Sequence, residues 1–267
     1  MGPHGQRARM DSELLLMHVL ERNRAWLTAH GDDDVPEEAC GRFVELLERR
    51  YRGEPIQHII GECEFCGLPF RVTSDVLVPR PDTEHLVEKV LGLAQCFERP
   101  RIVDIGTGSG AIAVALAHKL PAAHITATDL SPSALTVARE NAATNRVEAR
   151  IRFLEGDLLL AVPGEQFDIV ASNPPYVPNT DRALIAVEVR EYEPGLALFG
   201  GEDGLDVYRR LIPAAHAALI SGGFIALEIG FTQSEAIERL LVSAGFQNIE
   251  FTPDLQGILR VASSQRP

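Results

Sequence analysis

A short proline-rich run, residues 173–176, carries the side chains best suited to chemistry. The run consists of Asn173, Pro174, Pro175 and Tyr176. Two prolines hold φ at roughly −65° and lack an N–H group, so the run is stiff and its carbonyl oxygens are available as acceptors. The Asn173 side-chain oxygen and the Pro174 carbonyl could take the two hydrogens of one planar NH2 group, on which Tyr176 could stack. We call residues 173–176 the clamp loop.

The clamp loop predicts alkylation of an amide-type nitrogen. Such a nitrogen is a poor nucleophile because its lone pair is delocalised, and holding both hydrogens orients it and favours the tetrahedral geometry of the transition state. A sulfonium methyl donor is already activated, so the reaction requires neither a strong general base nor a metal. We therefore predict that residues 173–176 are catalytic and that no metal is bound. The structural alternative is a stiff loop that merely ends a strand.

A second segment, residues 104–110, is suited to binding a nucleotide-like cofactor, and we call it the glycine loop. Its glycines let the backbone approach a ligand closely. Gly106, Gly108 and Ala111 also satisfy the looser dinucleotide fingerprint. The glycine loop therefore leaves a nicotinamide cofactor and S-adenosylmethionine both open. Its residues are Asp104, Ile105, Gly106, Thr107, Gly108, Ser109 and Gly110.

Acidic residues after two later strands extend the predicted cofactor site. Asp129 lies 25 residues after Asp104, where a carboxylate can accept both hydroxyls of an adenosine ribose. Asp157 could accept a hydrogen bond from an adenine amino group, and Leu158 could lie against the ring. The alternative roles are helix or turn capping for Asp104 and Asp129, and a turn position for Asp157.

The elements that must position these loops occupy the second part of the chain. From residue 101 onward apolar strand-like runs alternate with helical patterns, which predicts parallel βαβ units with helices on both faces of a sheet. The last two strands have only a short link and are expected to pair antiparallel at an edge. The predicted strands are residues 101–105, 124–129, 151–154, 167–172, 224–229, 246–251 and 258–262, and the predicted helices are residues 111–119, 132–144, 205–219 and 233–244.

The first part of the chain has a different pattern. Residues 11–53 show helical periodicity that is interrupted by residues 31–36, which predicts a small helical module. Residues 56–78 are typical of a β-hairpin, after which Asp82 or Thr83 is expected to cap a helix. Cys63 and Cys66 form a C-x-x-C pair within the hairpin. We interpret them as hairpin residues, with a redox or metal role as the alternative.

The overall composition restricts the class of protein. A chain of 267 residues with 45% hydrophobic content can bury a large core, and its apolar stretches are shorter than the roughly 20 residues that cross a bilayer. A net charge of −13 disfavours binding that depends on neutralising phosphates. We expect a cytoplasmic protein with no membrane contact and no direct binding of nucleic acid.

Taken together, the motifs resemble the release-factor glutamine methyltransferases, the HemK/PrmC family. The resemblance implies an α/β fold, in which a seven-stranded class I, Rossmann-like methyltransferase domain follows a small N-terminal helical bundle and a β-hairpin linker. We accordingly predict a substrate-docking domain at residues 1–60, a linker at 61–80 and a methyltransferase domain at 81–267. The segments that carry the resemblance are residues 11–16, 53–56, 61–65, 67, 76–84, 104–110, 129–131, 156–157, 173–176, 193–194 and 200–204.

The resemblance also implies an activity. S-adenosylmethionine would donate a methyl group to the side-chain nitrogen N5 of the glutamine in the Gly-Gly-Gln motif of class 1 peptide release factors, which supports translation termination and leaves S-adenosylhomocysteine. The helical module would dock the release factor. The cofactor contacts predicted from the residues and the resemblance together are Asp104, Gly106, Thr107, Gly108, Ser109, Gly110, Asp129, Asp157, Leu158 and Asn173.

Two alternatives remain open at this point. The clamp loop would equally suit an N6-adenine or N4-cytosine nucleic-acid methyltransferase, although the chain lacks a basic, aromatic-rich recognition region. The glycine loop would suit a nicotinamide-dependent oxidoreductase or a nucleotide-binding module without chemistry. After the clamp loop, the acidic residues Glu188, Glu191 and Glu193 either shape a substrate entrance or lie in a solvated loop.

Overall fold

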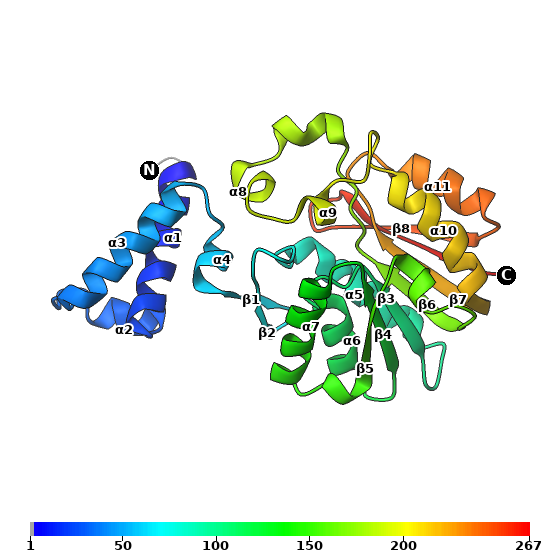
Figure 1. Ribbon diagram of the computed structural model, residues 1–267, viewed down its shortest axis with the longest axis horizontal. Coiled ribbons are helices and arrows are strands. Elements are labelled where there is room, and N and C mark those ends of the chain that lie inside the picture. The colour runs from blue at the N-terminus through cyan, green and yellow to red at the C-terminus, as the bar shows by residue number, and fades with distance from the viewer. Residues whose placement is uncertain (1–2) are drawn as a thin grey trace. The chain divides into compact units, whose positions relative to one another are not determined.

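The computed structural model describes residues 3–267, which divide into two compact units. One unit contains the chain up to Glu62 together with Ala186–Tyr192, and the other contains Cys63–Ile185 and Glu193–Pro267 (Figure 1). The sequence patterns did not indicate that residues 186–192 belong with the N-terminal helices. The domain boundaries at residues 60 and 80 stay a prediction.

The N-terminal unit is helical. Its apolar core includes Leu15, Leu46, Ile56 and Ile59, which come from three different helices. Arg50 lies among acidic groups, with Nε 2.7 Å from Asp11 Oδ2 and Nη1 2.9 Å from Glu188 Oε2. The helices are α1 (Pro3–Leu20), α2 (Arg24–Ala29), α3 (Glu37–Tyr51), α4 (Ile56–Ile60) and α8 (Val187–Arg190).

Helix α4 corrects the predicted extent of the hairpin. Residues 56–60 form a short helix, and the hairpin is confined to β1 (Glu62–Phe65) and β2 (Leu68–Arg71). Pro55 is the N-cap residue of this helix, with φ −56° and ψ 136°, and Gly61 ends the helix in the left-handed region at φ 85°. Proline before a helix and glycine after it are common helix boundaries, so these residues delimit a helical turn where alternation alone suggested a strand.

The larger unit is built on a seven-stranded sheet, which confirms the predicted α/β class. The strand order is β5-β4-β3-β6-β7-β9-β8, with parallel pairing from β5 to β7 and antiparallel pairing of β9 with both β7 and β8. Because β9 lies between β7 and β8, β8 is the edge strand at this end of the sheet, and β5 is the edge strand at the other end. The strands are β3 (Arg101–Ile105), β4 (His124–Asp129), β5 (Ile151–Glu155), β6 (Phe167–Ser172), β7 (Leu219–Glu228), β8 (Gln247–Pro253) and β9 (Leu259–Gln265).

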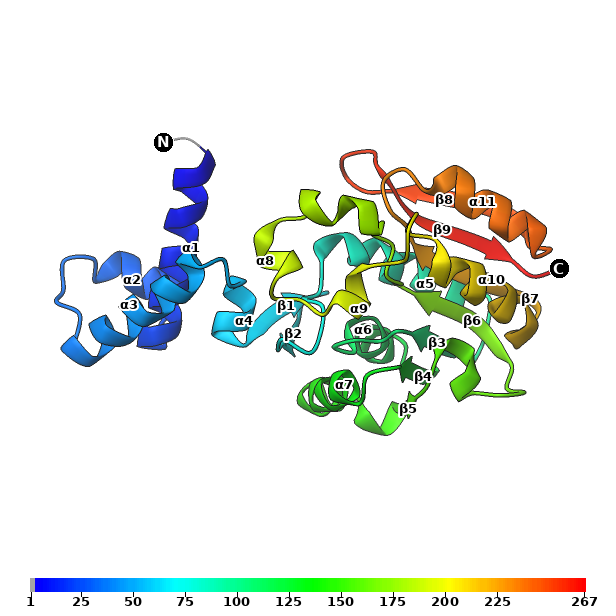
Figure 2. The ribbon, with the colours of Figure 1, turned by 45° about the horizontal axis from the view of Figure 1, so that its top comes forward.

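Helices cover both faces of this sheet (Figure 2). Successive strand residues point to opposite faces, so Ile102 packs in the cluster of α5 and α6, whereas Val103 packs in the cluster of α10 and α11. The helices are α5 (Glu84–Ala94), α6 (Ala111–Lys119), α7 (Pro132–Thr144), α9 (Gly195–Leu198), α10 (Asp206–Ala218) and α11 (Ser234–Ser243), and the 3-10 turns are η1 (Pro81–Thr83), η2 (Glu148–Arg150), η3 (Leu158–Ala161) and η4 (Asn179–Leu184).

Strand β7 begins five residues earlier than predicted, directly after α10. Gly222 adopts φ 81°, and a side chain at Gly223 would lie 3.0 Å from the Asp168 carbonyl oxygen. The glycines thus allow the chain to cross close to β6 while it continues as a strand, whereas the prediction left residues 220–223 unassigned. Among residues 3–267, no helix is long and apolar enough to cross a membrane.

Candidate functional site

The glycine loop and the clamp loop leave the same edge of the sheet. Strands β3 and β6 are parallel neighbours, with Ile105 paired to Ser172 at their carboxyl ends. The Ser172 hydroxyl donates to the Ile105 carbonyl over 2.7 Å and so joins the two strand ends. Ligands of open α/β sheets bind outside the carboxyl ends of the strands. The structure therefore brings the two sequence-predicted loops together at an edge where a ligand can bind.

The glycine loop has a backbone that requires glycine. Gly106, Gly108 and Gly110 all have positive φ, at 71°, 55° and 81°. The N–H groups of Gly106 and Thr107 both donate to the Thr128 carbonyl, over 2.8 and 2.9 Å, which fastens the loop to the end of β4. The loop is consequently a compact turn in the left-handed region, where a side chain would introduce strain.

Asp129 stands at the end of β4 and organises both neighbouring loops. Its Oδ2 accepts the Gly108 N–H over 2.8 Å and its Oδ1 accepts the Ser131 N–H over 2.9 Å. Each carboxylate oxygen can accept more than one hydrogen bond, so this arrangement leaves capacity for the ribose hydroxyls that the sequence assigned to Asp129. Capping and ligand binding are compatible at this residue. The contact with a ribose stays a prediction.

Asp104 is completely buried behind the glycine loop. Its Oδ2 accepts the Thr107 hydroxyl over 2.6 Å, and its Oδ1 is buried without a hydrogen-bond partner among residues 3–267. Burial raises the pKa of Asp104 to about 7, although the Thr107 hydroxyl opposes the shift. Asp104 thus supports the shape of the loop from inside the protein, and its direct contact with a cofactor stays a prediction.

Asn141 on α7 holds the glycine loop from its other side, and sequence reasoning missed it. Its Nδ2 donates to the Ser109 carbonyl over 2.8 Å and to the Arg71 carbonyl over 3.0 Å, while its Oδ1 accepts the Arg71 N–H over 2.7 Å. The side chain is fully buried. The only available signal was an asparagine among apolar residues of a helix, and that signal does not say what the amide contacts.

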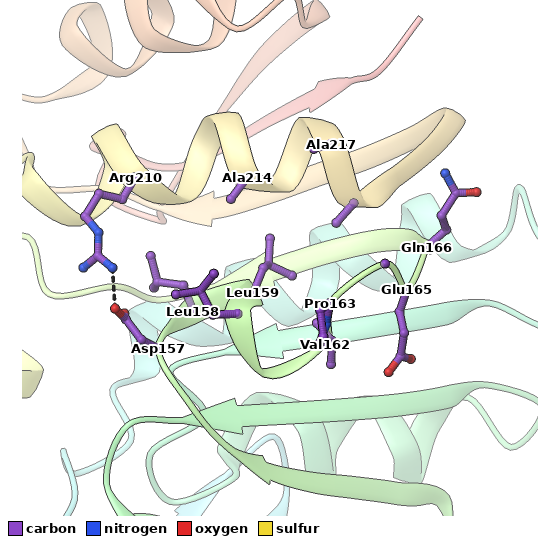
Figure 3. Close-up of a pocket in the computed structure, with 13 residues that line it drawn as sticks. Asp157, Leu158, Leu159, Val162, Pro163, Glu165, Gln166, Arg210, Ala214 and Ala217 are labelled. Atoms are coloured by element: carbon purple, nitrogen blue, oxygen red, sulfur yellow. Dashed lines mark hydrogen bonds and ion pairs between the residues drawn. The ribbon is translucent and has the colours of Figure 1, made fainter.

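Asp157 and Leu158 lie beyond β5, beside α10. Asp157 forms an ion pair with Arg210 of α10 (Figure 3). Leu158 has a positive φ of 53°, and its carbonyl accepts the Thr128 hydroxyl over 3.3 Å. Both residues line an open pocket of about 610 Å³ between η3 and α10, to which neither the glycine loop nor the clamp loop contributes. The adenine contacts predicted for Asp157 and Leu158 stay predictions.

The donor of the clamp loop bonds inside the protein, whereas two of its acceptors do not. Asn173 Nδ2 donates to the Thr83 hydroxyl oxygen over 3.1 Å. Among residues 3–267, no group of the chain donates a hydrogen bond to Asn173 Oδ1 or to the Pro174 carbonyl. The amide is therefore anchored through its donor side, and the two acceptors that the sequence assigned to an NH2 group are not used inside the protein.

Tyr176 is held at both its ring and its backbone. Its hydroxyl donates to Glu228 Oε1 over 3.3 Å, and its carbonyl accepts Gln233 Nε2 over 2.9 Å. A side chain at Gly204, which has φ 76°, would lie 2.2 Å from that carbonyl oxygen, so only glycine fits there. Burial raises the pKa of the Tyr176 phenol, which therefore stays protonated. Sequence reasoning missed Glu228 and Gln233, which share no local pattern with the clamp loop.

Comparison with known proteins identifies the family. A model of the PrmC N-terminal domain matches residues 4–61, and a model of the methyltransferase small domain matches residues 83–189. A release factor glutamine methyltransferase of Koribacter versatilis is 42% identical over 97% of this chain and 91% of its own length. The chain belongs to the release factor glutamine methyltransferase family. A member from Cereibacter sphaeroides is 45% identical over 97% of this chain and 92% of its own length.

A solved structure supports the fold. The crystal structure of a methyltransferase from Pyrococcus furiosus aligns with a TM-score of 0.56 and 20% identity, and covers 83% of this chain and 98% of that one. The seven-stranded methyltransferase fold with an N-terminal helical region is thus confirmed. Membership of a methyltransferase family implies use of S-adenosylmethionine and disfavours both the nicotinamide-dependent and the nucleic-acid alternatives.

Glu193 corrects the interpretation of the acidic stretch. Its carboxylate is completely buried, and both oxygens accept Arg80 Nη2 over 2.7 Å. Arg80 precedes η1, so the ion pair ties the chain after the clamp loop to the segment that leads into α5. Glu193 is therefore not part of a solvated loop. Loss of Arg80 should be costly, because it would remove a hydrogen-bonded cation from a completely buried carboxylate.

The surroundings of Cys66 disfavour a reactive thiolate in the hairpin. Cys66 occupies the turn between β1 and β2 with φ 52°, and its N–H donates to Glu84 Oε1 over 2.7 Å. Burial raises the pKa of its thiol to about 11, which disfavours the reactive thiolate. Within the part of the chain that the structure describes, no three His, Cys, Asp or Glu side chains are grouped as metal ligands.

Proposed function

We propose that this chain transfers the methyl group of S-adenosylmethionine to the side-chain nitrogen N5 of the glutamine in the Gly-Gly-Gln motif of class 1 peptide release factors. The observation that carries the proposal is the pair of acceptors in the clamp loop. Asn173 is anchored through Nδ2 on Thr83, while its Oδ1 and the Pro174 carbonyl receive no donor from residues 3–267. A primary amide has the two N–H groups that match such a pair.

The residues at the sheet edge fit the cofactor. Three glycines in the left-handed region let the loop after β3 approach a ligand, and Asp129 presents carboxylate oxygens beside that loop. Asp157 and Leu158 follow β5 and would serve the adenine. When bound there, S-adenosylmethionine supplies a methyl group that is activated by its sulfonium. No general base of high basicity is then required of the chain.

The residues of the clamp loop perform the positioning. Asn173 Oδ1 and the Pro174 carbonyl hold the two N–H groups, and the Tyr176 ring stacks on the planar amide. In the transfer, the nitrogen lone pair would form the new N–C bond to the methyl group, and the sulfur would keep the electron pair of the S–C bond that breaks. One N–H proton leaves to water or to one of the same acceptors. Two oriented acceptors stabilise the developing positive charge on nitrogen more than they stabilise the neutral amide.

A labelled-methyl assay tests the proposal. The full chain is incubated with methyl-labelled S-adenosylmethionine and, separately, a class 1 release factor, its Gly-Gly-Gln Gln→Ala variant, transfer RNA, ribosomal RNA and DNA. We expect label only in the unaltered release factor. Equal labelling of a nucleic acid, or of the Gln→Ala variant, would overturn the assignment of the substrate.

A calorimetric titration tests the cofactor separately. We expect S-adenosylhomocysteine to bind the chain and NADH not to bind. Binding of NADH without binding of S-adenosylhomocysteine would contradict the proposed use of the glycine loop.

A further inference from the structure

Two buried polar side chains, Thr83 and Glu228, stand behind the clamp loop and have no role in the mechanism described so far. Thr83 is 4% exposed and Glu228 is 1% exposed. They lie far apart in the sequence, Thr83 before α5 and Glu228 at the carboxyl end of β7. Burying polar groups costs free energy unless they make hydrogen bonds, so the contacts of these two side chains indicate what they are buried for.

Thr83 occupies a helix-capping position but does not cap. It is the N-cap residue of α5, where a threonine side chain usually accepts a backbone N–H of the first turn. Here the side chain makes no such bond, and its oxygen instead accepts Asn173 Nδ2 over 3.1 Å. Thr83, one of the two residues that the sequence predicted as a helix cap, therefore contacts the clamp loop, 90 residues away.

Glu228 contacts the other end of the clamp loop. Its Oε1 accepts the Tyr176 hydroxyl over 3.3 Å, and its backbone carbonyl accepts the Tyr208 hydroxyl over 2.6 Å. Burial raises the pKa of the Glu228 carboxyl, while the Thr83 and Tyr176 hydroxyls oppose that shift by favouring the charged form. Glu228 Oε2, the second oxygen of this carboxylate, is buried and accepts no hydrogen bond among residues 3–267.

A hydroxyl alone does not orient an amide, because it can either donate or accept. A carboxylate can only accept. The Thr83 oxygen accepts Asn173 Nδ2, and the unpartnered Glu228 Oε2 offers an acceptor for the Thr83 proton. A Thr83 proton directed to that oxygen keeps the Thr83 oxygen an acceptor, which selects Nδ2. Asn173 Oδ1 then points the other way, as an acceptor for a substrate N–H. The reversed amide would present Nδ2 donors to the substrate NH2, and two donors repel each other.

We propose that Thr83 and Glu228 are positioning residues that set the orientation of the Asn173 amide and hold the Tyr176 ring for methyl transfer. This proposal rests on the proposed function for its kinetic consequence. Its structural content, the fixed direction of the Asn173 amide, does not depend on which substrate is methylated.

Removal of the Thr83 hydroxyl gives the first test. Thr83→Val keeps the shape of the side chain, and we expect kcat for release-factor methylation to fall about tenfold, the scale of one hydrogen bond. KM and the affinity for S-adenosylhomocysteine should change less than about twofold. Thr83→Ser restores the hydroxyl and should restore kcat to within about threefold. Equal losses in Thr83→Val and Thr83→Ser, or no loss in Thr83→Val, would overturn the role of the hydroxyl.

A matched control and a second variant define the effect further. Thr136→Val removes an exposed hydroxyl of α7 that donates to the Pro132 carbonyl of its own helix, and its kcat should equal that of the wild type. Glu228→Gln retains the size of the side chain but can donate to Thr83, so kcat should fall several-fold without a loss of melting temperature. Wild-type kcat in Glu228→Gln would overturn the accepting role of the carboxylate.

Nuclear magnetic resonance separates this proposal from the proposed function. The side-chain amide signals of Asn173 are identified by their loss in Asn173→Ala, and their hydrogen exchange is measured in the full chain without substrate. We expect slowed exchange in the wild type and in Thr83→Ser, and faster exchange in Thr83→Val. Unchanged exchange in Thr83→Val overturns the positioning proposal. A wild type that labels no release factor refutes the proposed function instead, while the exchange comparison still decides the orientation.

Discussion

The glycine loop and the clamp loop follow neighbouring strands, yet they are built on opposite principles. The glycine loop uses residues with unusual backbone freedom. Its N–H groups donate hydrogen bonds to the Thr128 carbonyl and the Asp129 carboxylate at the end of β4. The clamp loop uses prolines that restrict the backbone, and two of its acceptors are bonded to nothing among residues 3–267. One loop is shaped to fit close to a ligand, and the other is shaped to hold one group in one direction.

This difference teaches where each loop derives its precision. The glycine loop derives its shape from the left-handed backbone of its three glycines and from hydrogen bonds of its backbone to Thr128, Asp129 and Asn141. The side chains of the clamp loop are fixed by Thr83 and Glu228, which belong to distant parts of the chain. Changes at the two loops should therefore affect different measurements: catalysis for the clamp loop, and cofactor binding or stability for the glycine loop.

The largest effect is expected from Asn173→Ala. It removes one oriented acceptor, and kcat/KM for methyl transfer should fall by roughly 30- to 1000-fold, which corresponds to about 2 to 4 kcal/mol of transition-state stabilisation. The labelled-methyl assay measures this fall. Asn248→Asp, at an exposed position of β8, serves as the control and should keep the wild-type value. An unchanged kcat/KM in Asn173→Ala would refute the clamp.

Asp104→Asn should change stability rather than catalysis, in a pH-dependent way. The pKa of Asp104 is raised to about 7 in the folded chain, from an ordinary value near 4. The folded state therefore binds more protons than the unfolded state between these values, and its stability falls as pH rises from about 4 to about 7. Denaturant unfolding should show this fall in the wild type, on the order of a few kcal/mol, and a flatter profile in Asp104→Asn. The same pH dependence of stability in the wild type and in Asp104→Asn would contradict the raised pKa of Asp104.

Gly110→Ala tests the backbone requirement of the glycine loop. Gly110 has φ 81°, and an added Cβ would lie 3.1 Å from the Ala138 Cβ. Strain in the left-handed region should lower the free energy of unfolding by about 1 to 2 kcal/mol and weaken binding of S-adenosylhomocysteine, as calorimetry would measure. Gly92→Ala, at an exposed position inside α5 with open space around it, should instead stabilise the chain by about 0.5 to 1 kcal/mol. Similar changes in the free energy of unfolding for both variants would contradict the requirement for glycine at position 110.

The smallest effect should come from the ion pair between Asp157 and Arg210. The side chains are 38% and 56% exposed, so solvent screening limits their contribution, and Arg210→Gln should cost at most about 1 kcal/mol of stability. If Asp157 serves the adenine, Asp157→Ala should also weaken binding of S-adenosylhomocysteine, whereas Arg210→Gln should leave it nearly unchanged. Calorimetry on both variants makes the comparison, and equal affinities would remove Asp157 from the cofactor site.

Local sequence signals predicted much of the larger unit. Helices α6 and α7 begin and end at the predicted residues, because Gly110 precedes one, and Ser131 with Pro132 begins the other. Strands β3, β4 and β6 also have the predicted bounds. The prediction failed where the local signal was weak or misleading. It missed α4 between Pro55 and Gly61, and it began β7 too late because of Gly222 and Gly223.

By itself the sequence determined which atoms could do chemistry, since proline restricts a backbone and glycine frees one wherever the chain places them. It also determined that both loops follow parallel strands, because hydrophobic periodicity is a local property. Only the tertiary structure decided which atoms are used internally. The sequence alone could not show that Thr83 serves Asn173 and not α5, that Glu193 is buried against Arg80, or that Asn141 holds the glycine loop. These pairings join residues that are distant along the chain, and burial requires each polar group to find a partner in space.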